Sequence, residues 1–174
     1  MFSRIRKRLI GLGRDRKGAV AVEFALVVLP FFIMLTAMVE ISYVSFKAAV
    51  MEGAAREAAR QVRTGVVQNA ADAATRFESE FCPNLLGLFA CADFYYDVRN
   101  FADFSAIVLP DPVYGADGVP QGLQFSPGAS NAIVTVRVIH VHSFLTPLVG
   151  SLMGGASSSL PLIATVVFRT EPYE

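Results

Sequence analysis

The sequence predicts an α+β protein, in which one long N-terminal helix packs on a small antiparallel β-sheet domain. Three observations predict this fold. An apolar stretch, Ala19 to Val39, follows a basic leader. Residues 40–81 contain no proline, and their apolar side chains recur every three or four positions, as on one face of a helix. After Cys82 the chain becomes rich in aromatic residues, Pro and Gly, and contains several strand-like runs.

The leader, residues 1–18, carries a charge of +6, because seven basic residues face a single acid, Asp15. The formal net charge of the whole chain is zero, so the remainder carries −6. Basic flanks of membrane spans stay in the cytoplasm, and this explains the leader better than nucleic-acid binding does. The basic residues are Arg4, Arg6, Lys7, Arg8, Arg14, Arg16 and Lys17.

The stretch Ala19 to Val39 is long enough to cross a bilayer. As a helix it measures about 31 Å at about 1.5 Å per residue, and a hydrocarbon core is about 30 Å thick. A cleaved secretory signal has a shorter apolar core of about 7 to 15 residues, so a span is favoured. We expect a single-pass membrane protein, with a cytoplasmic N-terminus and an exported C-terminal domain.

Residues 40–81 are predicted to continue the helix as an amphipathic segment. The simplest prediction is one helix over residues 19–81, about 90 Å long, with Gly53 and Gly65 as points where it could bend or stop. Charged residues such as Lys47 lie on the other faces, and Glu52 and Arg56 are spaced for an ion pair. The predicted apolar face contains Ile41, Val44, Ala48, Met51, Ala55, Ala58, Val62, Val66, Ala70, Ala74, Phe77 and Phe81.

Residues 82–174 form the predicted exported β-rich domain. Strands are expected at Phe94 to Phe101, Ile133 to His142 and Leu160 to Thr170, with loops at Val113 to Gly128 and Gly150 to Ser159. A domain this small has a small core, which the apolar face of the helix would complete.

Cys82 and Cys91 are the two cysteines of the chain. Both fall on the predicted exported side, where disulfides persist, so we expect them to be bonded to each other. Closing so short a loop stabilises a fold by about 2 to 3 kcal/mol on the chain-entropy estimate. Two free buried thiols are the alternative if the topology is inverted.

Catalytic and metal-binding patterns are weak. His140 and His142 lie two apart on one strand face, but no third ligand has matching spacing. No nucleophile elbow, phosphate-binding glycine loop or zincin helix is present in the sequence, so we expect no enzyme, no metal and no cofactor. The acids that could suggest calcium lack the alternating spacing of a calcium loop; they are Asp93, Asp97, Asp103, Asp111 and Asp117.

Glu23 is the residue that most needs an explanation. An ionised carboxylate within a span costs about 2.5 to 3.5 kcal/mol even on the lenient insertion scale. One interpretation is that Glu23, one turn inside the cytoplasmic interface, reaches the headgroups. The other is that a specific cationic partner is created when a peptidase cuts after Gly18.

The run from Arg16 to Leu26, RKGAVAVEFAL, resembles the prepilin-peptidase site of type IVb pilins. It looks most like that of the TadE-like minor pilins, or pseudopilins, of tight-adherence (Tad/Flp) pili. The ending from Arg169 to Tyr173 also resembles that of TadE-like proteins. The resemblance implies cleavage between Gly18 and Ala19.

The same resemblance implies roles and partners. Glu23, followed by Phe24, would meet the new N-terminal amine of a neighbouring subunit and set the register of packed helices. Partners would be other pilins and minor pilins, a prepilin peptidase and the inner-membrane assembly platform. Major Flp pilins are much shorter and usually have tyrosine after the glutamate, so Phe24 and the large domain favour a minor component, TadE-like or TadF-like.

An alternative function needs no chemistry at Glu23. It is an uncleaved single-span envelope protein whose exported domain scaffolds a complex or binds a ligand. A secreted or anchored enzyme is a third possibility, and it would require a convergent polar pocket that the sequence does not reveal.

Overall fold

The computed structural model describes residues 18–173, so most of the predicted leader, residues 1–17, lies outside the described residues. The chain divides into two compact units, Met1–Val39 and Glu40–Glu174. Helix α2 (Ala19–Arg63) contributes residues to both units, and Pro30 lies inside it without ending it.

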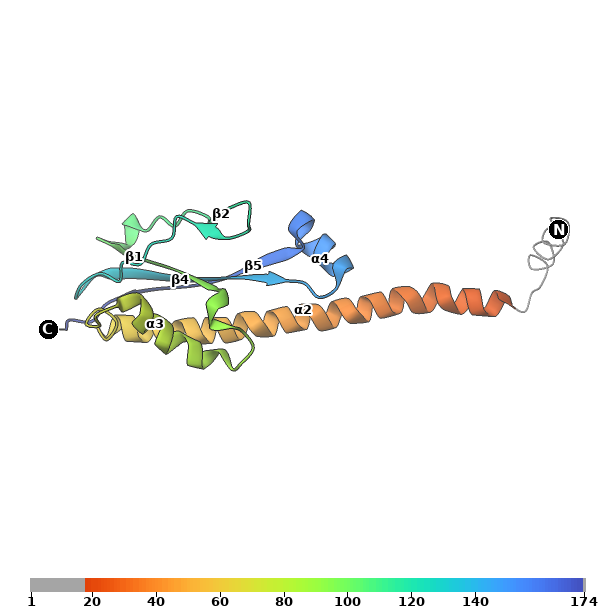
Figure 1. Ribbon diagram of the computed structural model, residues 1–174, viewed down its shortest axis with the longest axis horizontal. Coiled ribbons are helices and arrows are strands. Elements are labelled where there is room, and N and C mark those ends of the chain that lie inside the picture. The colour runs from red at the N-terminus through yellow and green to blue at the C-terminus, as the bar shows by residue number, and fades with distance from the viewer. Residues whose placement is uncertain (1–17, 174) are drawn as a thin grey trace. The chain divides into compact units, whose positions relative to one another are not determined.

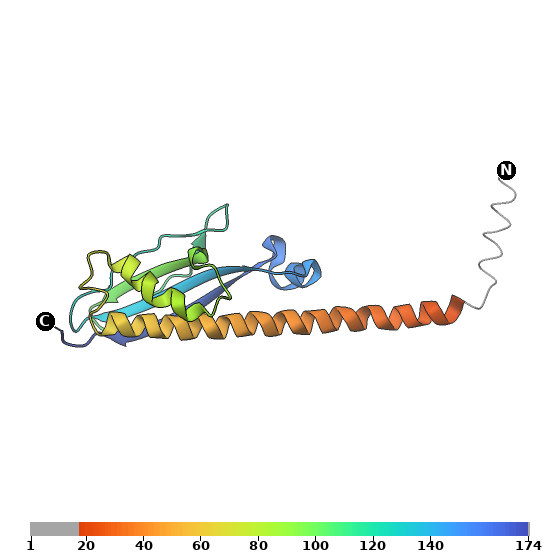
Figure 2. The ribbon, with the colours of Figure 1, turned by 60° about the horizontal axis from the view of Figure 1, so that its bottom comes forward.

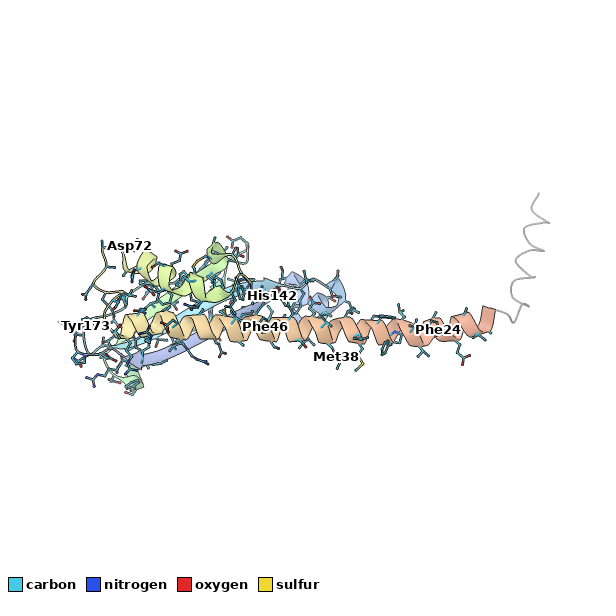
Figure 3. All side chains as sticks on the ribbon, turned by 90° about the horizontal axis from the view of Figure 1, so that it is seen from below. Phe24, Met38, Phe46, Asp72, His142 and Tyr173 are labelled. Atoms are coloured by element: carbon cyan, nitrogen blue, oxygen red, sulfur yellow. A yellow bond between two sulfur atoms is a disulfide. The ribbon has the colours of Figure 1, made fainter. Side chains whose placement is uncertain are left out.

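The first unit consists, in its described part, of apolar turns of α2. Every residue from Ala19 to Val39 is exposed except Val28 and Ala37, which are half-buried. Figure 3 labels Phe24, which is 67% exposed, on this part of α2. By length and composition the described chain has one helix able to cross a membrane, and it is α2. Soluble proteins rarely expose so continuous an apolar surface. Lipid or other protein chains are therefore needed to cover this stretch.

The second unit is an α+β fold, as predicted. The second part of α2 and helix α3 (Ala73–Phe81) lie on one face of a three-stranded antiparallel sheet (Figures 1 and 2). Small residues of α2 allow a close approach to the sheet, since Ala54, Ala55, Ala58 and Ala59 are all buried in the shared core. Phe77 and Phe81 of α3 are fully buried in the same core.

The sheet has the order β1-β4-β5, with β1 (Phe94–Phe101), β4 (Ile133–Ser143) and β5 (Ser159–Arg169). These strands confirm the three predicted runs to within a residue at each end. Val134, Val136 and Val138 of β4 face the helices and are completely buried. The opposite face of β4 is also buried, although Thr135 and Arg137 lie on it.

Residues 102–132 cover that opposite face (Figure 1). Within the predicted loop Val113 to Gly128 the chain forms a two-stranded sheet of β2 (Val113–Tyr114) and β3 (Pro120–Gln121). The predicted loop Gly150 to Ser159 likewise overlaps the second half of helix α4 (Pro147–Met153). Single 3-10 turns complete the described elements, at Cys82–Leu85, Cys91–Asp93, Phe104–Ala106 and Gly155–Ser157.

The prediction of one helix through residue 81 was wrong, because α2 ends at Arg63 and α3 begins at Ala73. Gly65 has a φ of +84°, a left-handed conformation that stops the helix. A Cβ at Gly65 would lie 2.6 Å from the ring of Tyr173, so only glycine fits there. Asp72 then starts α3 as its N-cap, accepting hydrogen bonds from two backbone N–H groups.

The C-terminal residues Thr170 to Tyr173 secure the end of α2. The N–H of Glu171 donates to the carbonyl oxygen of Arg63 over 2.9 Å, which satisfies one of the carbonyls left free at a helix end. Their side chains also form an ion pair at 3.1 Å. The buried hydroxyl of Thr170 donates to the carbonyl oxygen of Ala129 over 2.8 Å.

Candidate functional site

The predicted processing residues lie at the start of α2. Gly18 and Ala19 are both exposed, and a Cβ built on Gly18 meets nothing within 4 Å. Glu23 follows Ala19 by four positions, so both lie on one side of the helix, one turn apart. Glu23 and Phe24 are exposed, with Phe24 at 67%. The structure therefore leaves the bond after Gly18 and the carboxylate of Glu23 open to other molecules.

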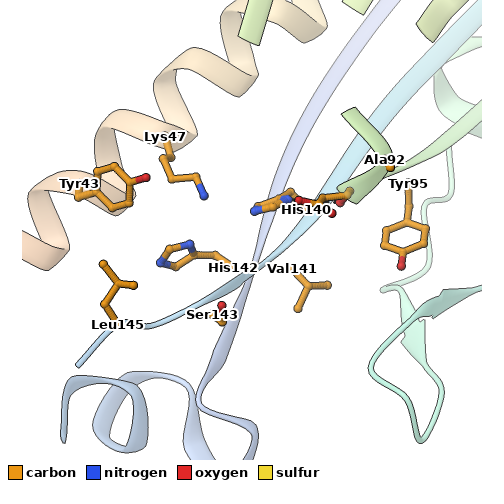
Figure 4. A pocket seen from close by; sticks show the side chains of 10 residues that line it. Tyr43, Lys47, Ala92, Tyr95, His140, Val141, His142, Ser143 and Leu145 are labelled. Atoms are coloured by element: carbon orange, nitrogen blue, oxygen red, sulfur yellow. Dashed lines mark hydrogen bonds between the residues drawn. The ribbon is translucent and has the colours of Figure 1, made fainter. Parts of the chain in front are cut away.

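A polar cleft of about 470 Å³ lies in the second unit, between α2 and one end of β4 (Figure 4). Lys47 projects into it from α2, although we predicted this lysine on a polar face and the structure buries it. The ammonium lies 4.3 Å from the ring centre of Phe89 and 5.7 Å from that of Tyr43, as in cation–π contacts. Burial lowers the pKa of Lys47, and the nearby Asp93 opposes that shift.

His140 and His142 line the same cleft from β4. Burial lowers the pKa of both imidazoles. Nδ1 of His140 lies 3.2 Å from the carbonyl oxygen of Asp93, whereas Nε2 of His142 is buried without a hydrogen-bond partner among residues 18–173. Both rings pack edge-on against aromatic side chains, His140 against Phe89 and His142 against Phe144. They are packed strand residues at one wall of the cleft.

Potential metal ligands converge elsewhere in the described chain. Glu78, Cys82 and Cys91 bring one donor atom each within 4.8 Å of one another. Cys82 and Cys91, however, form a disulfide, which joins the turn after α3 to the turn before β1. The Cα atoms of this pair are 5.7 Å apart, a separation usual for disulfides.

Glu40 is a buried carboxylate that the sequence analysis missed. It is only 5% exposed, and it accepts hydrogen bonds from the backbone N–H groups of Leu145 and Thr146. Thr146 is the N-cap residue of α4, so Glu40 ties the start of α4 to α2. The available signal was an acid placed directly after an apolar stretch, but its partner lies over a hundred residues further along the chain.

Asp97, one of the acids considered for calcium, is instead held by arginines. Its carboxylate contacts Arg137 at 2.6 Å and Arg99 at 2.8 Å, and it accepts from the N–H of Gln124. Burial raises the pKa of Asp97, but these hydrogen bonds outweigh burial and keep the pKa below its usual value. Arg137 also donates to the carbonyl oxygen of Pro110, so the group fixes residues 110–124 over the sheet.

Comparison with known protein families identifies a match at the N-terminal helix. Residues 18–60 match the family model described as TadE-like protein. No curated protein and no solved structure matches the chain. The matched segment begins at Gly18 and follows α2 almost to its end, which confirms the resemblance carried by residues 16–26. Over residues 18–60, which include most of α2, the chain is thus similar to TadE-like proteins.

Proposed function

We propose that the protein is a minor pilin of a Tad-type pilus, made as an inner-membrane precursor and cut after Gly18. The leader stays in the cytoplasm, and the domain from Glu40 onward is exported. The observation that carries this proposal is the TadE-like match, which begins at the residue where the cut would fall. The exposed apolar surface of Ala19 to Val39 supports it, because such a surface requires lipid or other helices around it.

Processing changes the electrostatics of the N-terminus. Hydrolysis of the bond between Gly18 and Ala19 removes the +6 leader and leaves a protonated amine on Ala19. An unpaired charged amine in an apolar bundle costs free energy, as the carboxylate of Glu23 does. An ion pair between the two groups of neighbouring subunits lowers the cost of both. The pair fixes the axial register of the helices more than it stabilises them. Exposed Phe24 supplies apolar contact beside the pair.

Peptidase processing is tested by intact-mass measurement. When the full chain is produced with its cognate prepilin peptidase, it should lose the mass of residues 1–18. Gly18→Val should keep its full mass; since a side chain at Gly18 meets nothing in the fold, this loss of processing reflects the peptidase. Gly13→Val, a matched change within the leader, should be processed normally. An unchanged mass for the wild-type chain would contradict cleavage.

The role of Glu23 is tested in assembly. Glu23→Ala should still insert and be processed, but it should fail to support normal piliation. Glu52→Ala is the control, because Glu52 lies on the same helix in an exposed pair with Arg56 at 2.7 Å, and such pairs contribute little. Normal piliation by Glu23→Ala would refute the register role and favour an uncleaved envelope protein that scaffolds or binds through its domain.

A further inference from the structure

An exposed apolar tip connects β4 to β5 in the second unit (Figure 1). We call residues 145–153 the tip; it contains α4. Leu145 is 81% exposed and Leu152 is 77% exposed, and Leu148 and Met153 are exposed as well. The sequence from Phe144 to Phe168 contains no Asp, Glu, Lys, Arg or His. An uncharged tip with several exposed leucines is unusual on a surface that faces only water.

The tip is held in place by Glu40. The carboxylate of Glu40 accepts from the N–H groups of Leu145 and Thr146, and Glu40 is itself buried. Inside the tip, Val149 is buried, so α4 is docked on one side while its leucines stay outside. The exposed leucines are therefore a fixed feature of the fold.

The position of Glu40 in the chain decides what can cover the tip. Glu40 is bonded directly to Val39, the last residue of the proposed span. A backbone group that is hydrogen-bonded to the carboxylate of Glu40 lies no farther from the end of the proposed span than one glutamate side chain and one hydrogen bond reach. Leu145 is such a group, and Leu148 and Leu152 follow within two turns of it. The leucines are thus presented beside the bilayer surface.

We propose that the tip inserts its exposed leucines into the outer interfacial layer of the membrane that α2 spans. This inference rests on the proposed function, because it takes Ala19 to Val39 as a transmembrane segment. Lipid fits the tip better than a protein partner does, because residues 145–153 themselves contain no charged side chain to orient a specific contact. Apolar side chains beside headgroups need no fixed partner geometry. The tip then acts as a second membrane contact, after the span.

Tryptophan fluorescence tests the insertion, because the natural chain contains no tryptophan. Leu152→Trp is made in the full chain, reconstituted in phosphatidylcholine–phosphatidylglycerol nanodiscs with or without bromine on the acyl chains. Bromine quenches only nearby indoles, so Leu152→Trp should lose most of its emission in the brominated discs. Leu152 is exposed, so this change leaves the core intact. Leu148→Trp is a second variant on the same helix.

Two matched tryptophans act as controls. Phe31→Trp lies in the proposed span and should be quenched. Val167→Trp is also an exposed apolar position, on β5, but it lies eight residues beyond Ser159, about 26 Å along the strand. Val167→Trp should keep its emission.

The outcomes separate the two proposals. Quenching of Phe31→Trp without quenching at positions 148 and 152 would overturn the membrane contact of the tip and leave the span intact. An unquenched Phe31→Trp would overturn the span itself. Emission from Leu152→Trp that is blue-shifted but unquenched would show that a protein surface covers the tip, which also overturns the lipid contact.

Discussion

Helix α2 behaves differently in the two units to which it contributes. Up to Val39 its apolar side chains are exposed on every side, whereas from Glu40 onward one face is buried against the sheet. The second unit therefore buries the apolar face of its part of α2 against its own sheet. The first unit can cover its apolar surface only with lipid or other chains. The TadE-like match, residues 18–60, covers both parts of the helix and stops before the sheet. The matched feature is thus the helix, with its two kinds of apolar surface.

Phenylalanine-to-alanine substitutions in the two units should differ most in their effect on the free energy of unfolding. Phe81→Ala removes a completely buried ring from the core of the second unit and should lower its free energy of unfolding by about 3 to 5 kcal/mol. Phe24→Ala removes an exposed ring from the first unit and should leave that value nearly unchanged. Chemical denaturation of the full chain in detergent micelles, followed by circular dichroism, measures both.

A substantial loss of stability in Phe24→Ala would contradict this difference between the units, because the second unit would then depend on the apolar part of the helix. Equal, small losses in both variants would show that the core around Phe81 is not formed. Only the predicted contrast supports a self-contained second unit.

A somewhat smaller effect is expected on the other face of the sheet. Arg137→Met leaves the buried carboxylate of Asp97 with Arg99 alone, and it should cost about 3 kcal/mol, at the lower end of the range for a broken buried pair. Adding Asp97→Asn removes the stranded charge while keeping an acceptor for the N–H of Gln124. The double variant should therefore be more stable than Arg137→Met. A double variant that is less stable than the single would refute the ion-pair interpretation.

The smallest effect is a pH dependence confined to the second unit. Burial lowers the pKa of His140 and His142 in the folded protein, so the unfolded chain takes up protons first as the pH falls below about 6.5. The free energy of unfolding should therefore be unaffected by these imidazoles above about pH 6.5. It should decline as the pH falls from there toward their lowered pKa values.

Replacing both imidazoles tests this dependence, because the chain has two histidines. The double variant His140→Phe/His142→Phe should lose the decline between about pH 6.5 and pH 5 in denaturation midpoints. Loss of stability below about pH 4 should remain, because the pKa of Asp97 is also lowered and its stabilisation disappears as that carboxylate is protonated. An unchanged pH profile above pH 5 would contradict the role assigned to the imidazoles.

Local patterns predicted most of the fold. Strand-like runs after Cys82 predicted β1, β4 and β5, and the three-to-four spacing predicted the buried face of α2 from Val44 to Val62. Gly53 and Gly65 were both predicted as possible stops, but the sequence could not distinguish them, because the end of α2 depends on contact between Gly65 and Tyr173, which are far apart in sequence. A glycine inside a helical pattern does not by itself reveal that its missing side chain makes room for a ring.

The candidate site residues show the same difference between features set by local sequence and features set by distant contacts. The motif around Gly18 and Glu23 is contiguous, so the sequence alone was enough to single it out. Glu40 and Asp97 were not recognised as buried acids, because their partners are Leu145 and Arg137, in other elements. Burial of a charge is set by such distant partners, and neither composition nor spacing contains that information.

The place of β4 in the middle of the sheet has a consequence for how the protein is made. Its partner β1 is synthesised before it, but β5 appears only after the tip, and Thr170 to Tyr173 come later still. During synthesis, one edge of β4 therefore cannot be fully paired until residue 169 has been added. Strands in that condition associate readily with other chains. Every residue inserted between Ser143 and Ser159 would lengthen the time for which that edge of β4 stays unpaired.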